Sequence, residues 1–398
     1  MSGITAEEAA GRMGVKVTTV YAYVSRGTLR SWRRPGSRTS LFDPEEVELL
    51  ARRGRPRRTT RPAALDVVIE TGLTVIGDHE VRYRGTSALE LARTATFEEV
   101  AQWLWTGRRE APDLPWEAPR VAIPEVAGAR DRLRLAVVMA SAADPLRADL
   151  AVPAVVARGR SLVATLVAAV AAAGDARAPR LVLPAGGPPI RGTIAGRLWG
   201  RLAGARAVPG MVAALNAALV LLADHELAAS TLAARVAASA RADPYGVVLA
   251  GLGPLSGNLH GGASRLAGEL LQAAGNVGPD AALARALETH QLLPGFGHRL
   301  YPEGDPRARL LLELVRSAVP GAIALGTVDR LIAAVRRRAQ LEPNVDLALA
   351  VLAAVARMPF DAGETVFTVA RTAGWIAHAI EEYGEAPLRF RARAAARR

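Results

Sequence analysis

Residues 251–266 read GLGPLSGNLHGGASRL, and residues 293–307 read LPGFGHRLYPEGDPR. Each stretch holds one histidine, His260 or His298, among glycines and prolines that interrupt Ala- and Leu-rich helical sequence. Glycine lets the backbone come close to a ligand, and loop residues carry function more often than they fill a core. We therefore interpret both histidines as functional residues of a helical protein.

Composition agrees with a helical fold. Half of the 398 residues are hydrophobic, only 5% are aromatic, and there is no cysteine. A chain of this length can bury a large core and is expected to form more than one domain. The missing cysteine excludes disulfides, thiolate metal sites and cysteine nucleophiles. We recognise no secretion signal, and the apolar runs 161–173 and 211–223 are short for a bilayer span, so we expect a cytoplasmic protein.

The positive charge is concentrated at the two ends of the chain. The net charge is +12, and residues 1–62 carry 13 Lys or Arg against 6 Asp or Glu. The last ten residues add 5 Arg, which leaves the sequence between the two ends close to neutral. An interaction with nucleic acid or another polyanion is therefore an expectation for the ends only.

The N-terminal region has the signals of a small winged helix-turn-helix domain. Thr5 with Glu8 predicts a capped helix, and a second short helix is expected over 17–24. The turn at 35–37 predicts a basic hairpin, and Asp43 caps a third helix. This order resembles the winged helix-turn-helix domains of excisionases and mercury-resistance-type regulators.

That resemblance implies that the second helix reads DNA while hairpin arginines contact phosphates. The candidate DNA-binding residues are Thr18, Thr19, Tyr21, Tyr23, Arg33 and Arg34. Alternatively, this region packs on the rest of the chain and has no DNA role. A basic, proline-containing linker is expected to follow it.

The remainder of the chain is expected to be mainly helical. Residues 74–83 predict one strand pair, and Thr96 with Glu99 predicts a capped helix that stops at Gly107. Helical patterns then follow one another, without the strand–helix alternation of a parallel sheet. Residues 224–226, Asp-His-Glu, are expected inside an otherwise apolar helix.

Simple motifs for cofactors and nucleophiles fail in this region. His225 and Glu226 begin the H-E-x-x-H pattern, but Ala229 replaces the second histidine. The run 251–256 imitates a dinucleotide fingerprint but ends in serine, and GASRL ends in Leu266 where a nucleophile elbow needs glycine. We therefore expect no metal, no nicotinamide and no serine nucleophile.

The remaining polar residues indicate acid–base chemistry on a substrate with carboxylates. His225 joins the two glycine-flanked histidines, and Asp346 follows Pro343-Asn344 at a predicted helix N-terminus. Arg307 and Arg371 interrupt apolar segments, where an arginine usually has a fixed anionic partner.

Five ordered motifs resemble the citrate synthase family over about residues 65–393. They are LADHELAAST at 222–231, GPLSGNLHGGA at 253–263, LPGFGHRLYPEGDPRA at 293–308, EPNVDLALA at 342–350 and FTVARTAGWIAHAIEE at 367–382. The resemblance implies condensation of oxaloacetate with acetyl-CoA and hydrolysis of the citryl thioester, a reaction of the tricarboxylic acid cycle. It implies no tightly bound cofactor, with acetyl-CoA or CoA as co-substrate.

The matching positions imply a role for each residue. Asp346 takes a methyl proton, His260 bonds the developing enol, and His298 polarises the ketone. Oxaloacetate is implied to be held by His225, Arg307, Arg371 and Arg391, the last lent by the second subunit of a homodimer. A turn implied to face CoA comprises Pro294, Gly295, Phe296 and Gly297.

The family also implies a mainly α fold in which a small helical domain closes over a large one. The expected parts are a winged helix-turn-helix domain at 1–53, a basic linker at 54–62, a large domain at 63–260 and 352–398, and a small domain at 261–351. Two alternatives stay open. One is a 2-methylcitrate synthase that uses propionyl-CoA, since one methylene changes discrimination by only about 1–3 kcal/mol. The other is a DNA-binding, metabolite-sensing regulator.

Overall fold

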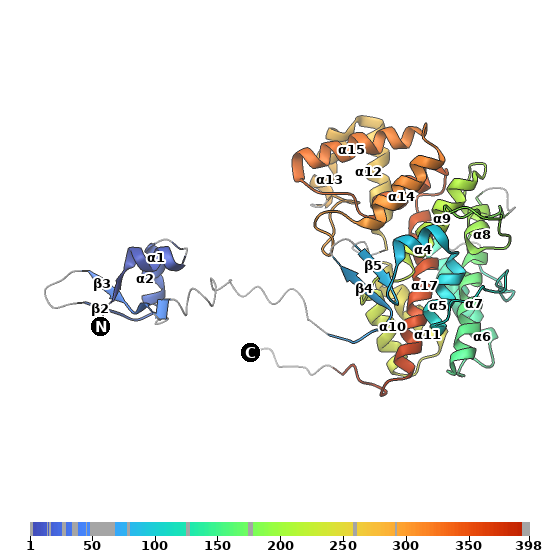
Figure 1. Cartoon of the computed structure of the whole chain (residues 1–398), viewed down its shortest axis with the longest axis horizontal. Coiled ribbons are helices and arrows are strands. Elements are labelled where there is room, and N and C mark those ends of the chain that lie inside the picture. Colours follow the sequence, from blue (N-terminus) through green and yellow to red (C-terminus); the bar gives the residue numbers. More distant parts are fainter. Residues whose placement is uncertain are drawn as a thin grey trace. The chain divides into compact units, whose positions relative to one another are not determined.

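The structure is a computed structural model that describes residues 3–13, 15, 17–25, 29–33, 39–44, 46–47, 68–77, 80–124, 128–173, 178–257, 261–290 and 293–391. The chain divides into two compact units, Met1–Glu70 and Thr71–Arg398. Figure 1 draws both units as ribbons.

The first unit is small and has its own apolar core. Its elements are β1 (Ile4–Thr5), α1 (Ala6–Met13), α2 (Val17–Ser25), β2 (Ser31–Arg33) and β3 (Ser40–Phe42), and the antiparallel strands lie in the order β1-β3-β2. Thr5 and Glu8 form the predicted reciprocal cap, because the Glu8 N–H donates to Thr5 Oγ1 and the Thr5 N–H donates to Glu8 Oε2. Val20, Phe42 and Val47 are fully buried between these elements.

The second unit begins with a three-stranded antiparallel sheet and continues as helices. The strands are β4 (Thr74–Gly77), β5 (Glu80–Tyr83) and β6 (Thr86–Ser87), in the order β4-β5-β6. The helices are α4 (Ala88–Thr94), α5 (Phe97–Thr106), α6 (Ala129–Ala143), α7 (Val152–Ala169), α8 (Ile194–Leu202), α9 (Pro209–Leu222), α10 (Ala229–Ser239), α11 (Pro244–Leu255), α12 (Ala263–Val277), α13 (Pro279–His290), α14 (Pro306–Ala318), α15 (Ile323–Ala339), α16 (Val345–Val355) and α17 (Ala362–Tyr383). The predicted mainly α architecture is confirmed.

Helix α5 shows why the sequence folds as it does locally. Thr96 accepts the Glu99 N–H and Glu99 returns a bond to the Thr96 N–H, which is the predicted capping box. Gly107 ends the helix with φ 71°, a left-handed conformation that glycine adopts without steric cost. The amphipathic segment between these signals then packs on the core.

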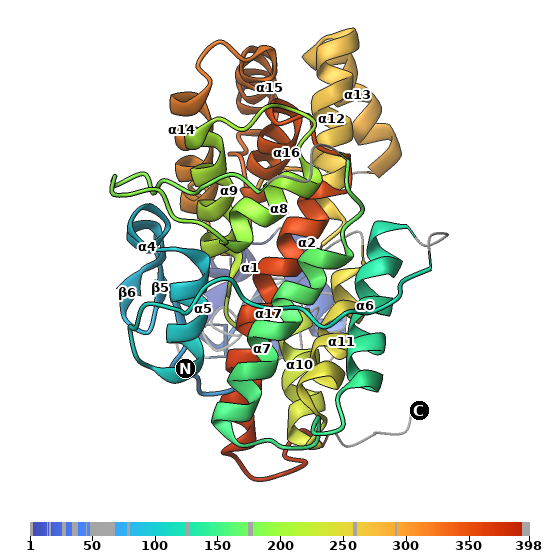
Figure 2. The same ribbon diagram turned by 90° about the vertical axis from the view of Figure 1, so that its right-hand side faces the viewer.

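Helix α17 is the centre of the second unit. Figure 2 shows it running through the middle of the unit, with α7 on one side and α10 and α11 on the other. Trp375 is fully buried, and the indole N–H of Trp105 on α5 donates to the Ala373 carbonyl at 2.8 Å. Helices α12 to α15 lie together at one end of the unit (Figures 1 and 2).

The region before α10 corrects one prediction. Asp224, His225 and Glu226 do not lie inside a helix, because α9 ends at Leu222, α10 begins at Ala229 and Glu226 has φ 51°. The carbonyl groups that would continue α9 are used by α17 instead. Arg371 Nε donates to the Leu222 carbonyl at 2.9 Å, and the Gly374 N–H donates to the Ala223 carbonyl at 2.9 Å.

One helix within the described ranges, α7, is long and apolar enough to span a bilayer by length and composition. It begins before the apolar run predicted at 161–173 and ends within that run, and 61% of the helix is buried inside the unit. It packs against α5, α6 and α17, so its apolar surface is accounted for by the core.

Two glycines of α11 allow a test of this packing. A Cβ added to Gly251 would lie 2.6 Å from the ring of Trp375, whereas one added to Gly253 would meet nothing within 4 Å. We expect Gly251→Ala to lower the free energy of unfolding by about 1–3 kcal/mol through overpacking. The measurement is the urea unfolding midpoint of each variant.

Gly253→Ala is the matched control in the same helix. Alanine favours a helix over glycine, so this variant should be neutral or gain up to about 1 kcal/mol. Equal behaviour of the two variants would contradict the close contact between α11 and α17.

Candidate active site

A cavity of about 540 Å³ brings together the predicted residues that come from distant parts of the chain. It lies within the second unit, and the break before α10, the loop before α14, the starts of α14 and α16, and α17 all contribute to its wall. The predicted residues in the lining are His225, Pro294, Gly295, Phe296, Gly297, His298, Arg307, Asp346 and Arg371.

Asp305 holds the starts of two helices in place at this cavity. Its side chain is fully buried, with Oδ1 accepting from Arg307 Nε at 3.0 Å and Oδ2 accepting from Arg307 Nη2 at 2.9 Å. Oδ2 also accepts the N–H of Val345, the first residue of α16, at 3.0 Å. Although burial opposes ionisation, the Arg307 guanidinium holds the pKa of Asp305 below its usual range. One carboxylate thus fixes both Arg307 and the start of α16.

Asp346 lies in the first turn of α16, as predicted. Asn344, two residues earlier, caps the helix, because its Oδ1 accepts the Asp346 N–H at 3.1 Å. Burial raises the pKa of Asp346 to about 7, while the charge of Arg307 opposes the rise. Within the described part of the chain, no group donates a hydrogen bond to this carboxylate. The group is therefore suited to accept a proton near neutral pH.

The turn 294–298 is tied to the segment before α16. The Asn344 side-chain amide donates to the Gly297 carbonyl at 3.0 Å, and the Gly297 N–H donates to the Glu342 carbonyl at 2.8 Å. Gly295 has φ 84°, and a Cβ there would lie 2.9 Å from that of Leu347. Both the conformation and the close approach require glycine at this position.

His298 presents a neutral imidazole to the cavity. Its Nδ1 accepts the Leu300 N–H at 3.1 Å, which places the ring proton on Nε2. Arg307 Nη2 lies 3.4 Å from Nε2, and in this tautomer that approach is a contact between two donors. Burial and the Arg307 charge lower the pKa of His298. The neutral Nε2–H can donate to a substrate oxygen.

Arg371 is a buried cation with an unused donor. It is 1% exposed, and its Nη1 has no hydrogen-bond partner within the described ranges. Burial lowers the pKa of Arg371 to about 10, so the group still carries its charge at neutral pH. An unpaired buried donor is costly, and it favours an anion in the cavity. Among the described residues Arg371 forms no salt bridge with a carboxylate. Its Nε donates to the Leu222 carbonyl, and the charge of the buried Asp224 acts on it.

A buried polar network supports the break that carries His225. Asp224 Oδ2 accepts from Thr74 Oγ1 and from His378 Nε2, and His378 Nδ1 accepts from Arg235 Nη1 at 2.9 Å. Contact with His378 and the charge of Arg371 lower the pKa of Asp224 despite its burial. The network joins α10, α17 and β4 behind the cavity.

Two predicted residues are not placed in this cavity. His260 falls in 258–260, outside the described residues. Arg391 is the last described residue and is exposed, and the described lining does not include it. Sequence reasoning missed Asp305, although an aspartate before a proline at a helix start is a capping signal that could have pointed to it.

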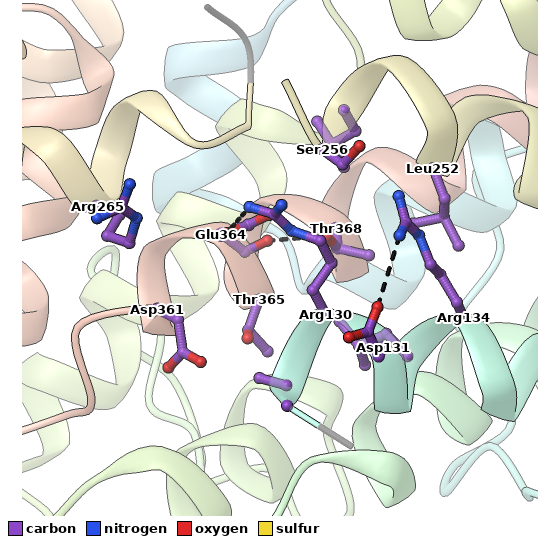
Figure 3. Close-up of a pocket in the computed structure, with 14 residues that line it drawn as sticks. Arg130, Asp131, Arg134, Leu252, Ser256, Arg265, Asp361, Glu364, Thr365 and Thr368 are labelled. Carbon is purple, nitrogen blue, oxygen red and sulfur yellow. Dashed lines mark hydrogen bonds and ion pairs between the residues drawn. The ribbon is translucent and has the colours of Figure 1, made fainter. Parts of the chain in front are cut away.

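A second cavity of about 320 Å³ lies where α6, α11, α12 and α17 meet. Figure 3 shows Arg130 against Glu364 and Arg134 beside Asp131, and Arg265 pairs with Glu269. Its arginines are thus matched by carboxylates, and the described residues that line it include no histidine. Acid–base chemistry is therefore assigned to the first cavity.

The first cavity can perform a defined kind of chemistry. It combines a carboxylate whose pKa lies near 7, a neutral imidazole donor and two cations. A base facing a donor is what proton removal next to a carbonyl requires. Among the described residues, no group of three His, Asp or Glu is arranged to hold a metal ion.

Comparison with known proteins agrees with this geometry. The family model described as "Citrate synthase, C-terminal domain" matches residues 65–393. "Citrate synthase 2" of Bacillus subtilis is 31% identical over 351 residues, which cover 81% of this chain and 92% of that protein. "2-Methylcitrate synthase 2" of Corynebacterium glutamicum is 31% identical over 179 residues, which cover 44% of this chain and 47% of that protein.

A solved structure shares the fold. The citrate synthase of Thermoplasma acidophilum, in a ternary complex with carboxymethyl coenzyme A and oxaloacetate, matches with a TM-score of 0.62 and 24% identity. The match covers 83% of this chain and 95% of that one. The family match over residues 65–393 and the relative that is 31% identical show that the chain belongs to the citrate synthase family, as an acyltransferase of that type.

Proposed function

We propose that the enzyme condenses oxaloacetate with an acyl-CoA, of which acetyl-CoA is the preferred candidate. It then hydrolyses the thioester to citrate and CoA. One observation carries this proposal: Asp346, with a pKa of about 7, lines the same cavity as the neutral imidazole of His298 and two arginines. We place the reaction in the cytoplasm, as the sequence predicts.

Asp346 is the proposed base. Its carboxylate takes a proton from the carbon next to the thioester carbonyl, and the electron pair moves onto the thioester oxygen. The resulting enolate carbon attacks the ketone carbon of oxaloacetate, while the neutral His298 donates a hydrogen bond from Nε2 to the ketone oxygen. The alkoxide formed there takes up the proton that Asp346 removed, which restores the Asp346 carboxylate. Water then cleaves the C–S bond, which releases CoA and leaves a new carboxylate.

The arginines are the proposed ligands of the oxo acid. Arg371 offers Nη1, and Arg307 keeps Nη1 while Asp305 occupies its Nε and Nη2. Charge-assisted bonds to carboxylates are about twice as strong as neutral ones, which suits two buried guanidiniums. His225 is the third proposed ligand.

Other parts of the reaction are proposed on family resemblance. His260 would bond the enol oxygen, and the backbone of 294–297 would face CoA. A small domain, 261–351, would close over the large domain formed by 63–260 and 352–398, and Arg391 would come from the partner in a homodimer.

The acyl group stays the open part of the proposal. A relative named 2-methylcitrate synthase makes propionyl-CoA the alternative donor. One methylene is worth only about 1–3 kcal/mol in an apolar pocket. Comparing the two acyl-CoAs in one assay therefore distinguishes a citrate synthase from a 2-methylcitrate synthase.

The first experiment measures thiol release from acetyl-CoA and propionyl-CoA with oxaloacetate. We expect release with at least one donor, and Asp346→Asn should lower kcat by about 10²- to 10⁴-fold because the base is lost. The wild-type kcat/KM should fall about tenfold per pH unit below pH 7, where Asp346 gains a proton, and level off above it.

Asp361→Asn is the control for the loss of a carboxylate at a helix start. Asp361 precedes α17 without making a side-chain cap and lines the other cavity, so activity should be retained. No release with either donor, or full activity of Asp346→Asn, would refute the proposed function.

Mixing subunits tests the proposed sharing of Arg391. Asp346→Asn and Arg391→Ala should each be inactive alone. After denaturation and refolding of an equal mixture, one site in each heterodimer regains both groups, so about a quarter of wild-type activity should return. Mock-mixed single variants are the control, and no recovery would mean that Arg391 does not act across the interface.

A second function is proposed for the first unit, which we infer to be a winged helix-turn-helix domain that binds DNA. Two observations favour it: the unit has its own core, and Tyr21 on α2 is 47% exposed. One candidate is corrected, because Tyr23 is 7% exposed and packs in that core rather than on the surface. The side chains of Thr18, Arg33 and Arg34 lie outside the described residues.

Gel retardation of promoter DNA, with and without oxaloacetate or CoA, tests this function. Tyr21→Ala should weaken binding about tenfold if the residue contacts a base edge. Val75→Ala, an exposed side chain of the second unit, is the control. Failure to bind any duplex at low salt, where phosphate contacts are strongest, would exclude the role.

A further inference from the structure

Tyr301 contacts His225, His298 and Arg307, three residues that line the cavity, although it is not itself among the lining residues. It lies in the loop before α14 and is 1% exposed. Its hydroxyl oxygen is 2.9 Å from His225 Nε2, and its ring centroid is 4.8 Å from that of His298. The Arg307 guanidinium lies 5.5 Å from the centre of the ring. One side chain therefore joins the three groups from behind.

The proton of this hydroxyl group decides the state of His225. Burial raises the pKa of Tyr301 above the usual range of a phenol, so the hydroxyl keeps its proton at working pH. Among the described residues, the acceptor recorded for this proton is His225 Nε2. A buried hydroxyl that donates to nothing is costly, which favours donation to Nε2 over acceptance from it.

We propose that Tyr301 is a positioning residue that keeps His225 in the tautomer with an unprotonated Nε2 and a protonated Nδ1. His225 then enters the reaction with its donor on Nδ1, while His298 has its donor on Nε2. The two imidazoles are packed edge to face, with centroids 5.5 Å apart and an interplanar angle of 86°. Tyr301 therefore fixes the tautomer of His225, while the Leu300 N–H fixes that of His298, so that each imidazole keeps one defined donor.

The ring of Tyr301 has a separate effect from its hydroxyl. The aromatic face lies against His298 and near the Arg307 cation, contacts that phenylalanine can also make. Tyr301→Phe removes the hydrogen bond to His225 and keeps these ring contacts. This substitution therefore isolates the proposed tautomer control from packing.

The kinetic test of this inference rests on the proposed function, because it needs an active enzyme. We expect Tyr301→Phe to raise the KM for oxaloacetate about five- to tenfold, the value of one hydrogen bond, and to leave the KM for acyl-CoA unchanged. Tyr245→Phe is the matched control, since Tyr245 is 4% exposed and its hydroxyl donates to Asp144 at 3.0 Å, away from the cavity. An unchanged KM for oxaloacetate, or an equal rise in both KM values, would overturn the inference.

A spectroscopic test does not depend on activity. In protein labelled with ¹⁵N-histidine, His225 should show an unprotonated Nε2 and a protonated Nδ1, and the signal is assigned by its loss in His225→Asn. Tyr301→Phe should shift this tautomer balance, while Tyr245→Phe should not. A protonated Nε2 in the wild type overturns the inference even if the enzyme is active. Without thiol release the proposed function fails, yet this spectrum still decides the tautomer.

Discussion

The bidentate pair between Asp305 and Arg307 is the interaction on which the proposed site depends. Asp305 is buried, so removing either partner would leave an uncompensated charge away from water. The same carboxylate caps α16 through the Val345 N–H. It therefore sets the separation between a cation for the substrate and the proposed base, Asp346, two groups that are 39 residues apart in sequence.

The other wall of the cavity depends on α17. Arg371, Gly374 and His378 occupy one face of this helix, and each contacts the segment 222–224. Gly374 permits the approach, because a Cβ there would lie 2.4 Å from the Ala223 carbonyl.

The raised pKa of Asp346 makes the stability of the folded protein depend on pH. Its contribution to stability is present below about pH 4 and is lost as the pH rises toward 7, since the unfolded chain ionises more easily.

Helix starts and stops that depend on neighbouring residues could be predicted from the sequence, whereas features that depend on contacts between distant residues could not. The cap at Thr96, the stop at Gly107 and the place of Asp346 at a helix start follow from neighbouring residues. The sequence predicts a helix at 224–226, whereas the structure has a break there, next to a hydrogen bond from Arg371, which lies about 150 positions away. The burial of Tyr23 was missed for a similar reason, since it depends on packing against other elements of the first unit.

The cavity shows the same contrast between what local sequence patterns predict and what depends on contacts in the fold. Pattern and resemblance pointed to most of the polar side chains that line the cavity, yet they did not point to the groups behind them. Asp305 and Tyr301 lie within the quoted motif at 293–308, but their partners become evident only through contacts. Support for a site comes from geometry that a linear pattern does not contain.

The unused Nη1 of Arg371 is a buried donor without a hydrogen-bond partner among the described residues. The proposed oxo acid would supply an anionic partner for this guanidinium, and a ligand at a hundred times its Kd adds about 2.7 kcal/mol to stability. Opened molecules are the ones that cellular proteases degrade. The lifetime of this protein in a cell should therefore follow the supply of its own substrate, so that the metabolite sets how much enzyme persists as well as how fast it works.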